Sequence, residues 1–282
     1  MNIQNLTQIE DRDGTANGTP NLLLPVGGAP YWTQAEIDGS AGALLAPWAI
    51  ASVEAFRQVV SKADFPCTFA TASEQQEQLV YAFVDTTREP ADIAAIGKAI
   101  VSYLDALDAM PQNKADYHVL VVFVRPVSDC SLAGYADMTQ QLLQSLHESD
   151  VAPWPADIPK DEDDPHWSFA FAGRALFVNV STPANVNRRS RNVGPSMTLI
   201  ISPREVFDRV AGPTDRGRKV RSIIRARTEA FDDGLAFAPW SSFAYGQGAV
   251  GTERSQYILS DDNTTPLEIS IKQCPFQRKY SE

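Results

Sequence analysis

The run HVLVVFV at residues 118–124 constrains the fold more than any other part of the sequence. β-Branched and aromatic side chains fill it without alternation, which is typical of a central strand buried on both faces of a sheet. Other short apolar runs predict further strands. These are FPCTFA (65–70), LVYAFV (79–84), MTLIIS (197–202), and a hairpin of WSFAFAG (167–173) and ALFVNVS (175–181) about Gly173 and Arg174.

Helical periodicity lies between these runs. Apolar side chains from Leu45 to Ser61 follow helical spacing, and Pro90 begins a second helix whose apolar stripe reaches Leu107. The other predicted helices are marked by a cap at Ser131, by a capping box at Ser202-Pro203-Arg204-Glu205, and by the apolar pattern of residues 220–231. Residues 151–165, with four prolines and five acids, predict a loop.

The strands occur in adjacent pairs, and helices do not alternate with them one for one. This order predicts an α+β fold, in which a mixed, largely antiparallel sheet packs against several helices in a single domain. The first 20 residues are polar, so we expect residues 1–20 to form a disordered or loosely docked tail. Residues 21–282 are then expected to form one globular domain.

Composition excludes several classes of protein. The formal net charge of −11 argues against general nucleic-acid binding, which needs a field that attracts phosphates. The sequence contains no stretch of about 18 apolar residues that would predict a membrane span, and its polar start lacks the pattern of a signal peptide. Three cysteines make a disulfide framework improbable. We therefore expect a cytoplasmic protein with no membrane and no nucleic-acid partner.

Positive charge is concentrated in one segment of this acidic chain. Between Asn185 and Arg227 there are eleven cations against three acids, and ten of the eleven are arginine. Arginine suits planar, bidentate binding of carboxylates or phosphates. The segment is either a solvated helix face paired with acidic neighbours or an anion-binding pocket.

Three side chains are candidates for cofactor chemistry. His166 follows the acidic loop and enters a strand beside Trp167, where it could ligate a flat aromatic cofactor or make a structural hydrogen bond. His118 begins the central strand, where a structural role is the simpler interpretation. Cys67 lies in a predicted strand, where a buried inert thiol is the base expectation.

A set of motifs in a fixed order adds to this interpretation. FPCTFA at 65–70, DPHWSFAFAGRALFVNVSTP at 164–183, NRRSRNVGPSMTLIISPREVF at 187–207 and CPF at 274–276 resemble the YqcI/YcgG family of bacterial proteins. The likeness extends from about Trp48 to Tyr280. Some members are similar to heme-dependent N-hydroxylases that oxidise a guanidino nitrogen of arginine or of an arginine-derived compound.

The resemblance implies heme b as the cofactor and O₂ as co-substrate. Arg188, Arg189 and Arg191 of NRRSR are then candidates for binding the heme propionates, and Trp167 is a candidate neighbour of the ring. An extended segment would place Arg189 and Arg191 on one side and Arg188 on the other. His166 is the leading candidate for the axial iron ligand, Cys67 is its rival, and His118 is a third possibility.

The implied function is that of a heme-dependent monooxygenase that N-hydroxylates a guanidino group of a small molecule in a biosynthetic pathway. No flavin or nicotinamide motif occurs, so electrons are expected from an external ferredoxin or reductase. Two alternatives stay open: a heme-binding protein without oxygenase activity, and a cofactor-free protein that binds an anionic small molecule. The sequence does not select the substrate or the oligomeric state.

Overall fold

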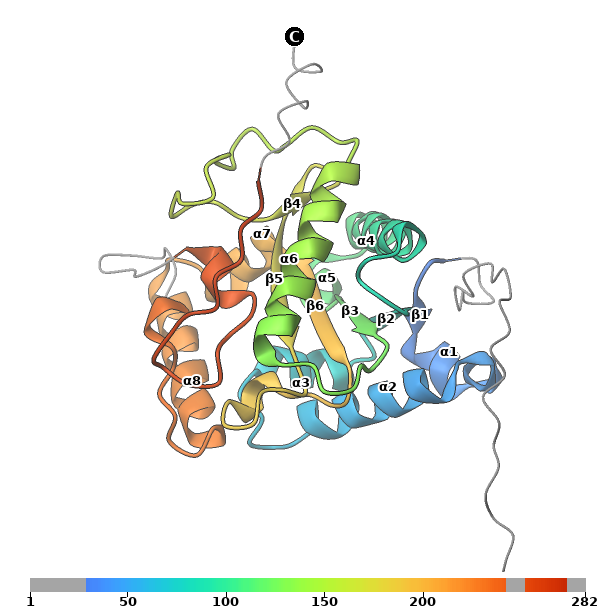
Figure 1. Ribbon diagram of the computed structural model, residues 1–282, viewed down its shortest axis with the longest axis horizontal. Coiled ribbons are helices and arrows are strands. Elements are labelled where there is room, and N and C mark those ends of the chain that lie inside the picture. Colours follow the sequence, from blue (N-terminus) through green and yellow to red (C-terminus); the bar gives the residue numbers. More distant parts are fainter. Residues whose placement is uncertain (1–28, 242–251, 273–282) are drawn as a thin grey trace, which may run out of the picture.

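The computed structural model describes residues 29–241 and 252–272, which form one sheet with helices on both faces (Figure 1). The predicted tail at 1–20 and the CPF segment at 274–276 lie outside these residues. In chain order the elements are β1 Trp32–Thr33, α1 Gln34–Asp38, η1 Ser40–Leu44, α2 Pro47–Val60, α3 Thr68–Gln75, β2 Leu79–Val84, α4 Pro90–Asp108, α5 Gln112–Ala115, β3 Val119–Val124, α6 Leu132–Ser149, β4 Ala170–Phe171, β5 Arg174–Ser181, η2 Arg189–Arg191, β6 Met197–Pro203, α7 Arg204–Ala211, α8 Asp215–Phe231, η3 Pro239–Ser241 and η4 Glu253–Gln256.

The sheet has six strands in the order β1-β2-β3-β6-β5-β4. Strands β2 and β3 run parallel, with Leu79 opposite Val119, and α4 connects them. The other neighbouring strands are antiparallel. The α+β prediction with a mixed, largely antiparallel sheet is therefore confirmed. No helix in the described ranges combines the length and the apolar character that a membrane crossing requires.

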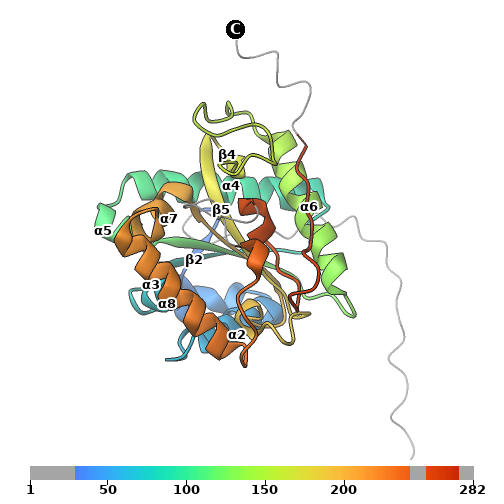
Figure 2. The ribbon, with the colours of Figure 1, turned by 90° about the vertical axis from the view of Figure 1, so that its left-hand side faces the viewer.

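Side chains of the central strands are buried on both faces, as the β-branched run predicts. Val80, Ala82 and Leu120 point into a core formed with α4 and α6. Tyr81 and Phe123 point the other way, into a second core that α2 covers. Figure 2 shows the sheet between these two helical layers. The arrangement follows from the two-residue period of a strand, which turns successive side chains to opposite faces.

Local signals at helix ends match the structure at two positions. Pro90 is the first residue of α4, and Ser131 caps α6 through its hydroxyl, which accepts from the Gly134 amide at 3.1 Å. The predicted hairpin is also present, although its first strand is short and the turn is made by Ala172 and Gly173. Both turn residues have positive φ, at 54° and 72°.

Two predictions of local structure are wrong, one at residues 65–70 and one at residues 202–205. FPCTFA is not a strand: Cys67 is the N-cap of α3, which begins at Thr68 and continues to Gln75. Its aromatic residues suit a strand, but the cap and the Ala, Glu and Gln that follow favour a helix. The capping box at 202–205 does not form either, because Pro203 itself is the N-cap and the Glu205 side chain pairs with Arg174.

The first core gives a direct test of the packing. Leu199 of β6 is fully buried there, whereas Val101 on the outer face of α4 is 42% exposed. We expect Leu199→Ala to lower the free energy of unfolding by about 2–5 kcal/mol, because it removes buried methyl groups and leaves a void. Val101→Ala, the matched control, should change it by less than about 0.5 kcal/mol. Equal effects in urea unfolding would contradict this packing.

Candidate functional site

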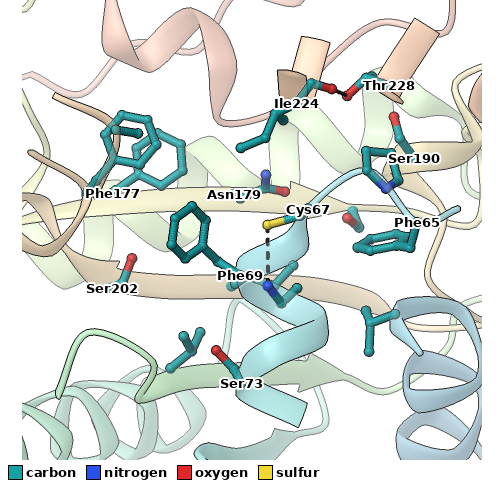
Figure 3. A pocket seen from close by; sticks show the side chains of 18 of the residues that line it. Phe65, Cys67, Phe69, Ser73, Phe177, Asn179, Ser190, Ser202, Ile224 and Thr228 are labelled. Atoms are coloured by element: carbon teal, nitrogen blue, oxygen red, sulfur yellow. Dashed lines mark hydrogen bonds between the residues drawn. The ribbon is translucent and has the colours of Figure 1, made fainter. Parts of the chain in front are cut away.

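A cavity of about 260 Å³ lies between the second face of the sheet and helices α3, α7 and α8 (Figure 3). Its volume lies just below the usual range of about 300–1,000 Å³ for small-molecule sites. Phe177 and Asn179 of β5 and Ile200 of β6 line it, because the residues that alternate with them pack into the first core. The cavity is thus a place where the sheet is not covered directly by a helix.

The chain reaches the cavity through the turn between α2 and α3. Helix α8 holds this turn, since Nη2 of Arg227 donates to the carbonyl oxygens of Ala63 at 2.8 Å and Phe65 at 2.6 Å. The Phe65 ring also packs edge-on against Phe231 at the end of α8, with 5.7 Å between ring centroids. These contacts fix the backbone immediately before Cys67.

The Cys67 thiol faces the cavity from the start of α3. Its Sγ accepts a hydrogen bond from the Ala70 amide at 3.4 Å, and Figure 3 shows the sulfur between Phe69 and Asn179 of β5. Burial raises the pKa of the thiol, whereas the amides of Ala70 and Phe69 and the charge of Arg191 act in the opposite direction. The group is therefore a protonated thiol at neutral pH, next to donors that stabilise its thiolate.

Arg191 brings a buried positive charge to the same cavity. Its Nη1 donates to Oδ1 of Asn179 at 2.9 Å and to the carbonyl oxygens of Val180 and Tyr257 at 3.4 Å. Burial, with a smaller effect of the Arg188 charge, lowers the pKa of Arg191 to about 9, so it stays charged at neutral pH. An anion in the cavity would stabilise this cation.

Two further arginines reach the cavity from α8. Arg221 and Arg225 are four residues apart and lie on the helix face that also carries Ile224 and Thr228, all of which line the cavity. Nη1 of Arg221 donates to the Gly212 carbonyl oxygen at 2.6 Å. Three guanidinium groups therefore border one space.

A carboxylate and a hydroxyl also line the cavity. Asp116, at the end of α5, uses Oδ1 to accept from Nε and Nη2 of Arg209 at 2.9 and 2.7 Å. The neighbouring Tyr117 ring lies 6.3 Å from the Phe69 ring, which connects this end of the cavity to the turn that carries Cys67. The buried Ser73 hydroxyl has no hydrogen-bond partner within the described chain, so a bound molecule could satisfy it.

Of the seven residues predicted as candidates for a cofactor site, Cys67 and Arg191 line this cavity. The His166 side chain is 78% exposed, with Nδ1 3.3 Å from Oδ1 of Asp164, and it is not among the described lining residues. This placement does not favour an iron ligand within the cavity. The role of His166 as a ligand stays a prediction.

Trp167 and His118 lie on the opposite side of the sheet from the cavity. Trp167 is fully buried in the first core and stacks on Trp154. The His118 ring stacks on Tyr103 of α4, with 5.5 Å between centroids, and burial lowers its pKa. Neither side chain is among the described residues that line the cavity.

The NRRSR arginines do not act together. Residues 189–191 form a 3₁₀ turn rather than an extended segment, so the expectation that Arg189 and Arg191 share one side is wrong. The fully buried Arg188 donates through Nε to the Ser260 carbonyl at 2.8 Å. Arg189 donates through Nε to the Phe231 carbonyl at 2.9 Å and thereby holds the end of α8. Both arginines anchor backbone, and Arg191 alone of the three borders the cavity.

Several lining residues escaped the sequence analysis. The alternation in β5 contained a signal, because Asn179 is polar between Val178 and Val180 and so marks the face that is not core. Arg221 and Arg225 could have been selected by their four-residue spacing. Asp116 carried no local signal, since its place depends on the ion pair with Arg209 of α7.

The site combines apolar walls, one thiol, three guanidinium groups and one carboxylate. Within residues 29–241 and 252–272 there is no group of three or more His, Cys, Asp or Glu side chains that could hold a bare metal ion. The thiol could ligate a soft metal through its sulfur, and the guanidinium groups could bind an anion. The carboxylate adds recognition of a cation.

Comparisons with known proteins agree with the family resemblance of the sequence. The sequence profile of the YqcI/YcgG family matches residues 56–277. DcsA of Streptomyces lavendulae, provisionally named an N(omega)-hydroxy-L-arginine synthase, is 35% identical over 228 residues, which cover 79% of this chain and 83% of DcsA.

Two proteins of Bacillus subtilis (strain 168) are also similar. YqcI is 33% identical over 76% of this chain and 81% of its own length, and YcgG is 31% identical over 75% and 80%. Their names assign no activity. No solved structure matches the chain.

The charge of Arg191 gives a test of the site's geometry. Because this charge lowers the pKa of the Cys67 thiol, we expect Arg191→Gln to slow alkylation of Cys67 at pH 8 by about twofold or more, through a smaller thiolate fraction. The rate is followed by mass spectrometry of the Cys67 peptide, with Cys130 as internal reference. Arg189→Gln, a change of the same kind outside the cavity, should leave it unaltered. Equal slowing in both variants would contradict the assigned contact.

Proposed function

The chain belongs to the YqcI/YcgG family, and from this premise we propose that it is a heme-dependent monooxygenase that hydroxylates a guanidino nitrogen of arginine or of an arginine-derived small molecule. The name of DcsA supports the reaction type, since the alignment with it covers most of both chains. The observation that carries the proposal is the cavity itself, where a thiol, three cations and a carboxylate meet.

The cavity fits the chemical character of heme. Iron protoporphyrin is a flat apolar ring with two propionates, and it needs one axial donor from the protein together with cations at its edge. The rings of Phe69, Phe177 and Phe207 supply apolar wall, and the Phe177 and Phe207 rings stack on each other with 4.9 Å between centroids. Arg191, a buried cation bonded only to neutral acceptors in the described chain, fits a carboxylate partner.

We assign the axial position to Cys67 and the propionates to Arg191, Arg221 and Arg225. Cys67 is the one of the three predicted ligands that lines the cavity, while His166 lies on the surface and His118 faces the other core. The thiolate is the ligating form of cysteine, so the Ala70 amide and the Arg191 charge would stabilise it. When bound, heme with a thiolate ligand supplies the activation of O₂ that oxygen insertion requires.

The protein's own residues then have to bind and orient the substrate. A guanidinium group is best recognised by a carboxylate in a bidentate contact. Asp116 is the acidic residue in the described lining, and Arg209 engages only its Oδ1, which leaves Oδ2 for a substrate. The apolar walls exclude water from the reacting nitrogen.

The overall reaction places one oxygen atom of O₂ in an N–H bond and reduces the other to water. It consumes two electrons and two protons, and no residue in the described part of the chain supplies the electrons. We therefore retain an external donor, a ferredoxin or a reductase, as part of the proposal.

Absorption spectroscopy tests the cofactor. The protein supplied with hemin should show a Soret band that shifts on reduction and on addition of CO, and it should convert L-arginine to an N-hydroxylated product by mass spectrometry when a reductase is present. Cys67→Ser, which keeps a capping side chain, should greatly alter the ferrous–CO spectrum, whereas His166→Ala should leave it unchanged. The reverse pattern would assign the ligand to His166.

Two further results would sink the proposal. If the protein shows no visible absorption after treatment with hemin and removal of the excess, heme is excluded as its cofactor. Stabilisation of the protein by small anions would then favour an anion-binding protein. A coloured protein that yields no product from arginine, agmatine or related guanidines would favour heme binding without oxygenase activity.

Asp116 tests substrate recognition. Asp116→Asn removes the charge while keeping the shape, so we expect the KM for L-arginine to rise about tenfold or more with a smaller change in kcat, as is usual for a lost charged contact to a substrate. Asp108→Asn is the control, because Asp108 also pairs with an arginine but lies on the surface, 71% exposed. Equal KM values for wild type and Asp116→Asn would remove Asp116 from the site.

A further inference from the structure

Helix α8 is strongly basic in an acidic protein. It carries six basic and two acidic side chains, a net charge of +4, while the whole chain has a net charge of −11. Burial is confined to one side of the helix, where Gly217, Thr228 and Phe231 pack inward. Figure 2 shows α8 running along the outside of the molecule, so most of its length faces solvent.

The outward side forms a small, defined surface. Arg216, Lys219 and Ile223 follow the spacing i, i+3, i+7 and therefore share one face of the helix. Arg216 and Lys219 are exposed and have no acidic partner in the described chain, and Arg218 pairs only with the neighbouring Asp215. Ile223 is 47% exposed among these cations. We call Arg216, Lys219 and Ile223 the α8 outer face.

The inward side of the same helix lines the cavity. Arg221, Ile224, Arg225 and Thr228 all contribute to the cavity wall. An α-helix with its side chains is about 10–12 Å across. A protein bound to the α8 outer face would therefore be separated from a molecule in the cavity by little more than one helix.

We propose that the α8 outer face docks an acidic one-electron carrier protein of the ferredoxin class. The proposal rests on the proposed function, which requires two electrons per turnover from outside the chain. In each encounter the carrier's reduced iron–sulfur cluster loses one electron to the heme in the cavity, and two encounters complete the reduction of O₂ to water and the inserted oxygen. Opposite charges attract and orient the two proteins, and Ile223 gives the contact an apolar centre.

The surface fits a transient complex with a protein better than it fits nucleic acid. Electron-transfer complexes have small interfaces, at the low end of the range for specific association. The three residues of the α8 outer face form a patch of that kind. Extended nucleic-acid contacts would bring phosphates against the remainder of the chain, which has an excess of acids.

Binding to a plant-type acidic [2Fe–2S] ferredoxin tests the proposal. Surface plasmon resonance on the full chain should give a Kd that weakens about tenfold or more between 50 and 300 mM NaCl, because screening removes the attraction. The double variant Arg216→Glu with Lys219→Glu should weaken binding about tenfold or more. A control with the same change in net charge, Lys98→Glu with Lys160→Glu, alters exposed lysines outside α8 and should bind nearly as wild type.

Reduction kinetics give a second readout that a general loss of folding would not mimic. In the Arg216→Glu and Lys219→Glu variant, reduction of the heme by ferredoxin should slow about tenfold or more, whereas reduction by dithionite should keep the wild-type rate. The same Soret spectrum in variant and wild type would show that the heme site is intact.

Three results would overturn the docking proposal: no binding of ferredoxin, equal weakening in the control pair, or displacement of ferredoxin by a random single-stranded oligonucleotide that binds more tightly. Failure of the proposed function is distinguishable from these. A protein that takes up no heme but binds ferredoxin through α8 would refute the oxygenase and keep the docking surface.

Discussion

Both faces of the central strands are apolar, and this constraint organises the rest of the structure. Strands β2 and β3 turn aliphatic side chains to one core, and their aromatic side chains together with Leu79 and Val121 to the other, so helices must cover both sides. In strands β5 and β6 only one face is uniformly apolar. On the other they present Asn179, Ser181 and Ser202, and a helix packed directly on these groups would leave them without partners. The cavity lies where the covering of the sheet is incomplete.

Arginine has two distinct tasks around this cavity. Arg188, Arg189 and Arg227 donate to backbone carbonyls and fix segments that are far apart in the sequence. Arg191 also bonds to carbonyls, yet it borders the cavity and keeps its charge there. Neutral acceptors hold a guanidinium in place without cancelling its field. The same hydrogen-bonding pattern therefore builds the fold and leaves positive potential for an anionic ligand.

The sequence predicted the features that depend on neighbouring residues. The β-branched run at 118–124, Pro90 and the Ser131 cap each specify local backbone, and the α+β class follows from their order. The site was less accessible, because only Cys67 and Arg191 of the predicted residues line the cavity. Cys67 was placed in a strand, and a cap that uses sulfur is not a common helix signal.

The remaining differences arise from packing between distant segments. NRRSR resembles a single cationic cluster, but its three side chains diverge because a 3₁₀ turn replaces an extended segment. His166 lies beside buried aromatic residues in the sequence, and the turn before β4 nevertheless leaves its ring in solvent. The two strands at the ends of the described sheet, β1 and β4, are only two residues long. Such short outer strands offer few unpaired amides and carbonyls to another chain, so the sheet resists edge-to-edge aggregation without needing charged gatekeepers.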